Sequence, residues 1–190
     1  MKTGLYFGSF NPVHVGHLII ANYMAYNTEL EQVWMILSPQ NPLKPSAALL
    51  NEYDRLHLLQ LAVEKENRLR ASNVEFSLPR PSYTIDTLTY LVEKHPEHEF
   101  AVILGSDSLE NLAQWKNYKE LLKRYPVYVY KRPGHEVAPY PEGKITVCEA
   151  PLLDISASYI RRMIREGKSV RYLLPDAVFE YITDNHYYRK

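Results

Sequence analysis

The stretch Gly8-Ser9-Phe10-Asn11-Pro12-Val13-His14-Val15-Gly16-His17 decides the fold of this 190-residue chain. A short apolar run, Leu5 to Phe7, precedes it, and a second, Leu18 to Met24, follows it. The pattern predicts a strand, a loop and then a helix that begins beside two imidazoles. His14 and His17 are three positions apart, so they share one face of a first helical turn.

Main-chain and imidazole donors make this unit a candidate phosphate site. A helix start offers unpaired N–H groups and about half a positive charge, which suits a phosphate. Gly8 and Gly16 lack a Cβ, so we expect the backbone to approach a ligand closely there. A lone histidine near a helix start is usually a cap or a solvated side chain. The pair with Gly16 between them, just after Pro12, favours phosphate binding.

Composition places the chain among ordinary globular proteins. Apolar residues make up 46% and charged residues 23%, and this length can bury one sizeable core. We therefore expect one domain over residues 1–190, with a helical tail at about 173–190. The 22 basic and 22 acidic side chains cancel, so no overall field favours nucleic acid or a membrane. An anionic ligand must instead meet a local cluster of donors.

Cysteine usage and the N-terminal pattern predict a cytoplasmic protein. The single Cys148 excludes an internal disulfide and a cysteine-rich metal site. Residues 3–28 carry no formal charge, but polar residues from Asn11 to Asn22 interrupt them, and no small-x-small cleavage site is evident. No run of about 18 apolar residues occurs, so we expect no transmembrane helix.

Apolar runs alternate with helical patterns along the rest of the chain. Buried strands are expected at 33–37 and 100–104, and shorter ones at 127–130 and 145–147. Helices are expected at about 51–66, 84–94, 107–123 (broken) and 156–166. This alternation predicts an α/β fold, a Rossmann-like open parallel sheet with helices on both faces and right-handed crossovers. Ligands bind beyond the carboxyl ends of such strands, where every motif falls.

Two further segments carry groups that suit phosphate or ribose. Ser156 is expected to cap a helix, with Ser158 and Arg161 in its first turns. Hydroxyls, free amides and a guanidinium together suit a triphosphate, and capping is compatible with that role. Asp107 follows a strand and Gly105, so it either caps the next helix or accepts a hydrogen bond from a ribose or ligand amide.

Two proline-rich loops and one tryptophan remain open to two interpretations each. Prolines in the segment 38–45 could hold Lys44 over the site, but a solvated surface lysine fits equally well. Thr84 follows the second such loop, 78–83, and could cap the next helix. Trp115 is either a core residue or an indole that stacks on a planar ring.

Together these motifs resemble those of bacterial nicotinate-nucleotide adenylyltransferases over about residues 4–165. The His-x-Gly-His signature specifies only the nucleotidylyltransferase superfamily, which includes class I aminoacyl-tRNA synthetases. The blocks Ser82-Tyr83-Thr84-Ile85-Asp86-Thr87-Leu88 and Gly105-Ser106-Asp107, the latter with Trp115, narrow the resemblance to the nicotinate-nucleotide enzymes. The chain departs from many relatives at three places: Asn11 stands for Asp, Ser158 for Thr, and the loop with Lys44 lacks a histidine.

The resemblance implies adenylyl transfer from ATP to nicotinate mononucleotide in NAD biosynthesis, with Mg²⁺ arriving on ATP rather than in a protein-built metal site. The implied catalytic residues are His14, His17, Arg161 and Lys44. The implied ATP-binding residues are Gly8, Ser9, Phe10, Gly16, Gly105, Asp107, Ile155, Ser156 and Ser158. By the same resemblance, Trp115 stacks on the nicotinate ring, and main-chain groups near Tyr83 and Thr84 meet its carboxylate.

Other function classes are weighed by the motifs they need. A related enzyme, such as a pantetheine-phosphate adenylyltransferase or a cytidylyltransferase, and a nucleotide-binding module without turnover stay open. A dehydrogenase would show Gly-x-Gly-x-x-Gly after the first strand, and that pattern is absent. A P-loop enzyme would need Gly-Lys-Ser/Thr, and we do not expect that motif to operate here. An aminoacyl-tRNA synthetase would need a basic tRNA-binding domain, and 190 residues with no net charge leave no room for one. A homo-oligomer and the choice between acidic and amidated mononucleotide also stay open.

Overall fold

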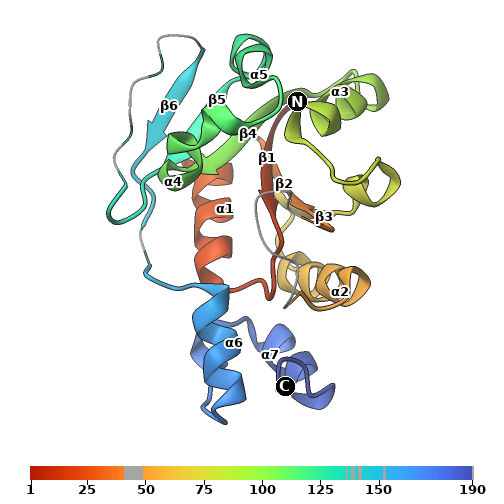
Figure 1. Cartoon of the computed structure of the whole chain (residues 1–190), viewed down its shortest axis with the longest axis vertical. Coiled ribbons are helices and arrows are strands. Elements are labelled where there is room, and N and C mark those ends of the chain that lie inside the picture. The colour runs from red at the N-terminus through yellow and green to blue at the C-terminus, as the bar shows by residue number, and fades with distance from the viewer. Residues whose placement is uncertain (41–48, 136, 138–139, 141–142, 152, 190) are drawn as a thin grey trace.

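A six-stranded parallel sheet organises the chain (Figure 1). The strands are β1 (Lys2–Gly8), β2 (Gln32–Leu37), β3 (Leu69–Ser72), β4 (Glu99–Gly105), β5 (Val127–Tyr130) and β6 (Ile145–Cys148). Their order is β3-β2-β1-β4-β5-β6, and every neighbouring pair is parallel. The computed structural model describes residues 1–40, 49–135, 137, 140, 143–151 and 153–189. The predicted Rossmann-like sheet is confirmed.

Helices follow the strands in alternation. The α-helices are α1 (Val15–Asn27), α2 (Glu52–Val63), α3 (Thr84–Lys94), α4 (Ser106–Glu110), α5 (Tyr118–Arg124), α6 (Ala157–Arg165) and α7 (Asp176–Asp184). Three 3-10 helices are η1 (Val74–Ser77), η2 (Leu112–Gln114) and η3 (Arg171–Leu173). The broken helix expected at 107–123 is α4, η2 and α5, interrupted at Asn111 and at Asn117, which has φ +52°.

Two hydrophobic cores cover the two faces of the sheet, because successive strand side chains point to opposite sides. Tyr6 of β1 packs in the core that α1, α2, α6 and α7 share. Its neighbour Leu5 packs in the core formed with α3, α4 and α5. The sequence did not reveal β3, because this edge strand mixes Leu69 and Ala71 with the polar residues Arg70 and Ser72.

Three helices begin in different ways. Asn51 caps α2, since its Oδ1 accepts a hydrogen bond from the Tyr53 N–H at 2.9 Å. The cap expected at Thr84 is wrong, because Thr84 is the first residue of α3 and Tyr83 precedes it without a side-chain cap. Asp107 is likewise inside α4, whose N-cap is Gly105.

The sheet order places a crevice at the carboxyl ends of β1 and β4. These strands are neighbours, but β1 leads to β2 on one side while β4 leads to β5 on the other. Connections that leave in opposite directions open a crevice at this switch point, where open α/β sheets bind ligands. Gly8 and Gly105 are the last residues of the two strands, so the motifs that follow them meet there.

The C-terminal segment lies beyond this edge of the sheet (Figure 1). α7 packs on α2, where the His57 and Tyr181 rings approach to 4.5 Å between centroids. Gly-Lys-Ser does occur, at 167–169, so its expected absence is wrong; it follows the C-terminal end of α6, whereas a P-loop connects a strand to an α-helix. Within the described part of the chain, no helix is long and apolar enough to cross a membrane.

Candidate active site

Two cavities open at the crevice and share one wall. The first encloses about 620 Å³ and the second about 730 Å³. The residues that line both are Tyr6, Phe7, Gly8, Ser9, Asp107, Ser108 and Tyr130. Because the wall is shared, molecules held in the two cavities would meet along the ends of β1 and β4.

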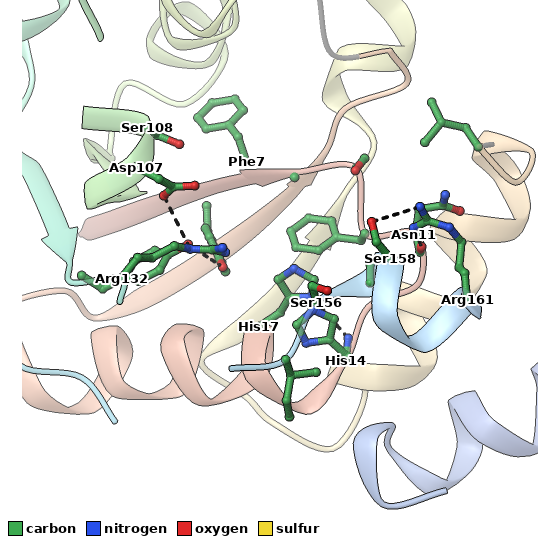
Figure 2. Close-up of a pocket in the computed structure, with 18 residues that line it drawn as sticks. Phe7, Asn11, His14, His17, Asp107, Ser108, Arg132, Ser156, Ser158 and Arg161 are labelled. Carbon is green, nitrogen blue, oxygen red and sulfur yellow. Dashed lines mark hydrogen bonds and ion pairs between the residues drawn. The ribbon is translucent and has the colours of Figure 1, made fainter. Parts of the chain in front are cut away.

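The first cavity gathers most of the residues predicted for ATP and catalysis (Figure 2). These are Gly8, Ser9, Phe10, His14, His17, Asp107, Ile155, Ser156, Ser158 and Arg161. Gly16 lines neither cavity, and Gly105 lines the second one. Lys44 falls outside the described residues. The cavity is also lined by residues that lie in no sequence motif and were not predicted, including Tyr130 and Arg132.

His14 and His17 lie against each other at the start of α1. His14 is the N-cap and His17 the third helical residue, and their rings stack with centroids 3.7 Å apart. The His14 backbone N–H donates to His17 Nδ1 at 3.3 Å. Since Nδ1 accepts this bond, a neutral His17 ring carries its proton on Nε2. The loop therefore selects the tautomer that can donate through Nε2.

Burial keeps His14 uncharged. His14 is only 4% exposed. This burial lowers the pKa of His14 to about 4, and the positive charge of Arg132 adds to the shift. Its Nδ1 has no hydrogen-bond partner among the described residues. At neutral pH His14 can therefore act as a neutral hydrogen-bonding group, and not as a cation.

The two loop glycines make room for rings of the protein itself. A Cβ on Gly8 would lie 2.8 Å from the Phe10 ring, and one on Gly16 would lie 3.0 Å from His14 Nδ1. Phe10 adopts φ +41° and packs edge-on against His17 at 5.1 Å. The close approach expected at these glycines is thus made by side chains that shape the loop.

The start of α6 supplies an anion-binding surface. Ser156 Oγ accepts a hydrogen bond from the Tyr159 N–H at 3.2 Å, so the predicted cap is confirmed. Arg161 donates through Nη1 to the Asn11 carbonyl at 2.7 Å and through Nη2 to Ser158 Oγ at 3.3 Å. Its buried Nε has no hydrogen-bond partner within the described residues. Free helix amides, hydroxyls and a guanidinium converge here, as phosphate requires.

A second cation stands across the cavity from Arg161 (Figure 2). Arg132 Nε lies 3.5 Å from Asp107 Oδ1, and their side chains are 43% and 37% exposed. Such a half-exposed pair contributes little to stability. It can therefore open at small expense in free energy, so that Arg132 becomes available to an anion and Asp107 to a hydroxyl.

Arg55 braces the loops around the first cavity. This side chain is 1% exposed, and its hydrogen bonds to the described residues go to main-chain carbonyls. The acceptors are Leu50 O (2.8 Å), Ser9 O (2.8 Å), Ser38 O (3.0 Å) and Pro39 O (2.9 Å). Burial lowers the pKa of Arg55 below its usual value. The guanidinium ties the loop after β1 to the loop after β2, and nothing in its local sequence marks it for that role.

The second cavity gathers the residues predicted for the mononucleotide. Tyr83, Thr84 and Trp115 all line it. Trp115 is half-buried and lies just after η2. Part of the side chain is therefore accessible, as stacking on a planar ligand would require. Thr84 is the first residue of α3, so this helix start, where N–H groups without a partner inside a helix are found, lies at the wall of the cavity.

A buried carboxylate fixes the wall of the second cavity. Glu75 is 2% exposed, and it accepts hydrogen bonds from Ser82 Oγ at 2.7 Å and from Thr87 Oγ1 at 2.9 Å. These hydroxyls flank Tyr83 and Thr84, so Glu75 sets the position of the start of α3. Ser82 and Thr87 belong to the predicted motif, whereas the Glu75 carboxylate that they bind lies outside it and was not predicted.

Neither cavity contains a carboxylate cage for a metal ion in the described part of the chain. A group of three candidate ligands, His95, Glu97 and His98, lies before β4 at the opposite end of the sheet. The first cavity offers the Asp107 carboxylate and serine hydroxyls. This hard-oxygen set fits Mg²⁺ that is held mainly by substrate phosphates and water.

Comparison with known proteins gives consistent matches. The model of the cytidylyltransferase-like family matches residues 5–163. The probable nicotinate-nucleotide adenylyltransferase of Cytophaga hutchinsonii is 49% identical over 189 residues, 99% of this chain and 98% of that protein. The corresponding protein of Flavobacterium johnsoniae is 48% identical, and the alignment covers both chains completely.

A solved structure shares the fold at much lower sequence identity. The nicotinic acid mononucleotide adenylyltransferase of Plasmodium falciparum, complexed with NaAD, superposes with a TM-score of 0.83 at 18% identity. The superposition covers 98% of this chain and 97% of that one. At this identity the likeness shows that the fold is shared.

Proposed function

This chain belongs to the cytidylyltransferase-like family and, within it, to the nicotinate-nucleotide adenylyltransferases, and on that premise we propose that its two cavities hold the two substrates of one transfer. The reaction joins the adenylyl group of ATP to nicotinate mononucleotide in NAD biosynthesis. Its products are nicotinate adenine dinucleotide and pyrophosphate. The first cavity is assigned to ATP and the second to the mononucleotide.

The donor groups of the first cavity support its assignment to ATP. The start of α6 and Arg161 suit the outer phosphates of ATP, because helix amides and a guanidinium line the same end of the cavity and both donate to anions. His14 and His17 would then lie at the α-phosphate, between Arg161 and Arg132 (Figure 2). Asp107 is suited to accept a hydrogen bond from a ribose hydroxyl. Lys44 stays a prediction.

The second cavity suits an anionic pyridine ring. Trp115 offers an aromatic face to a planar ring. The amides that begin α3 carry the partial positive charge that favours the nicotinate carboxylate. Glu75 holds these amides in place through Ser82 and Thr87.

The transfer needs alignment and charge neutralisation more than a base. The mononucleotide phosphate is already an anion at neutral pH, so one of its oxygens can attack the α-phosphorus directly. A new P–O bond forms as the bond to the pyrophosphate oxygen breaks, and negative charge moves to the leaving group. His17 can donate through Nε2 to that charge, and the uncharged His14 beside it can hydrogen-bond without a proton transfer.

Mg²⁺ is assigned to the phosphate end of the first cavity. When it is bound, it neutralises charge on the nucleotide phosphates. Ser156 and Ser158, whose hydroxyls line that end, are the groups of this chain that would help to hold it there. The residues that line the two cavities, and not the ion, align the two substrates in this proposal.

The shared wall carries the proposal, because it puts an imidazole-lined cavity and a tryptophan-lined cavity against each other at the ends of β1 and β4. The test is pyrophosphate release from ATP with nicotinate mononucleotide, its amidated analogue and phosphopantetheine as separate acceptors. We expect the acidic mononucleotide to give the highest kcat/KM. Faster turnover of phosphopantetheine, or nucleotide binding without pyrophosphate release, would overturn the assignment.

A further inference from the structure

The end of the chain turns back toward the loop between β1 and α1. α7 ends in a Schellman turn, in which the His186 N–H donates to the Thr183 carbonyl at 3.2 Å and the Tyr187 N–H to the Ile182 carbonyl at 3.1 Å. His186 adopts φ +56°, the left-handed conformation that this turn requires and that glycine usually supplies. The turn reverses the direction of the chain after the helix.

Tyr188 then contacts the loop between β1 and α1. It also adopts a left-handed conformation, with φ +62°, and its hydroxyl donates to Asn11 Oδ1 at 2.9 Å. The same oxygen accepts the Leu50 N–H at 3.1 Å, while the Asn11 carbonyl accepts Arg161 Nη1 at 2.7 Å. One loop residue therefore connects the C-terminus, the segment before α2, and α6.

The tail adopts this path against its own backbone preferences. Non-glycine residues in the left-handed region carry a conformational penalty, so two of them within three positions persist only where other contacts compensate. Burial raises the pKa of Tyr188 well above its usual value, although Arg55 and Arg161 are close enough to oppose the shift. The phenol is thus a stable donor beside the two guanidiniums that hold the loop.

Position 11 needs an acceptor oxygen for this arrangement. Asn11 is 3% exposed, and its side-chain oxygen accepts two hydrogen bonds. A carboxylate oxygen could accept the same two bonds. The exchange of Asn for the Asp of many relatives therefore leaves the link to Tyr188 possible.

We propose that Tyr188 is a positioning residue for adenylyl transfer, holding Asn11 so that the loop presents His14 and Arg161 to the phosphates. The inference rests on the proposed function. Tyr188 lines neither cavity, so it acts through Asn11 and not on a substrate. The role joins a residue near the end of the chain to a loop near its beginning.

The test compares Y188F with Y187F in the full-length protein. Y188F removes only the hydroxyl that reaches Asn11, whereas Tyr187 has its hydroxyl beside Asp54 and Tyr181 and away from the loop. We expect Y188F to lower kcat about tenfold with a smaller change in either KM, because the loop is misplaced and the pocket remains. Amide hydrogen exchange in the peptide that spans residues 8–18 should rise in Y188F, with Tm nearly unchanged. Y187F should leave kcat and loop exchange as in the wild type.

Two results would overturn the proposal. One is a Y188F protein that matches Y187F in both kcat and loop exchange. The other is a Y188F protein whose exchange rises throughout the chain and whose Tm falls, since that would indicate a general loss of packing. If the wild-type protein makes no product from ATP and nicotinate mononucleotide, the proposed function fails, while loop exchange still decides whether Tyr188 orders this loop.

Discussion

The two cavities are built in different ways, although they share a wall. The first takes most of its polar groups from two short segments, 8–17 and 155–161, each at the start of a helix. The second takes its groups from η1, the start of α3 and the region of α4 and η2. Phosphate can be bound by local backbone geometry, because a helix start already presents amides. A flat ring needs side chains that only the tertiary fold brings together.

The largest expected effect comes from removing an imidazole of the first cavity. H17A deletes the ring whose Nδ1 is held by the His14 N–H, and so it removes a preorganised donor. We expect kcat to fall about 10²–10³-fold. H95A, at the opposite end of the sheet, is the matched control. A loss of less than tenfold at saturating ATP would remove His17 from the transition state.

A smaller and more selective effect is expected in the second cavity. W115A should raise the KM for nicotinate mononucleotide about tenfold, because a stacking face is lost, while the KM for ATP changes less than twofold. W115F keeps an aromatic face, so its KM for nicotinate mononucleotide should lie between those of the wild type and W115A. Equal changes in both KM values would show that the cavities are not separate sites, and the comparison between them would fail.

Glu75 tests how the second cavity is held in shape. E75Q replaces one carboxylate oxygen with an amide group that donates, so Ser82 or Thr87 loses its acceptor and must redirect its hydroxyl proton, as Thr87 can to the Tyr83 carbonyl at 3.3 Å. We expect the KM for the mononucleotide to rise severalfold, on the order of the loss of one hydrogen bond, with no change in the KM for ATP. E93Q, an exposed glutamate of α3, serves as the control. An unchanged KM in E75Q would show that the start of α3 keeps its position without the carboxylate.

The smallest effect is expected in the pH dependence of stability near neutral pH, because His14 does not titrate there. The pKa of His14 in the folded protein, about 4, is below the ordinary histidine value of 6.5, because the ring is buried. The unfolded chain therefore binds more protons between these values, and stability present above pH 6.5 is lost as the pH falls toward 4. At about 1.4 kcal/mol per pKa unit, the loss is on the order of 3 kcal/mol.

Urea unfolding at pH 7 and pH 4.5, compared between wild type and H14Q, measures this contribution. H14Q should lose less stability over the same interval, because it has no imidazole to protonate. The ring resonances of His14 should titrate near pH 4. A midpoint near 6.5 would mean that the ring is exposed in solution, and the uncharged role assigned to it would be wrong.

Sequence reasoning found the residues whose neighbours along the chain explain them. His14 and His17 sit at one helix start, and Ser156, Ser158 and Arg161 at another, so local spacing predicted their grouping. It failed where a partner is remote. Glu75 is seven residues from Ser82, and the acceptors of Arg55 include carbonyls up to 46 positions away. Thr84 was misassigned as a cap, because α3 begins at Thr84 itself and Tyr83 stands at the N-cap position.

By itself, the sequence determined the α/β alternation, the parallel sheet and the two helix starts that we propose to bind phosphate, because periodicity and helix-end chemistry depend on residues a few positions apart. Only the tertiary structure decided that Arg55 would hold two loops, that Arg132 would face Arg161 across the cavity, and that Tyr188 would reach Asn11. These contacts join residues that strand order and chain reversal bring together. Their geometry depends on how the whole core packs, which no local pattern records.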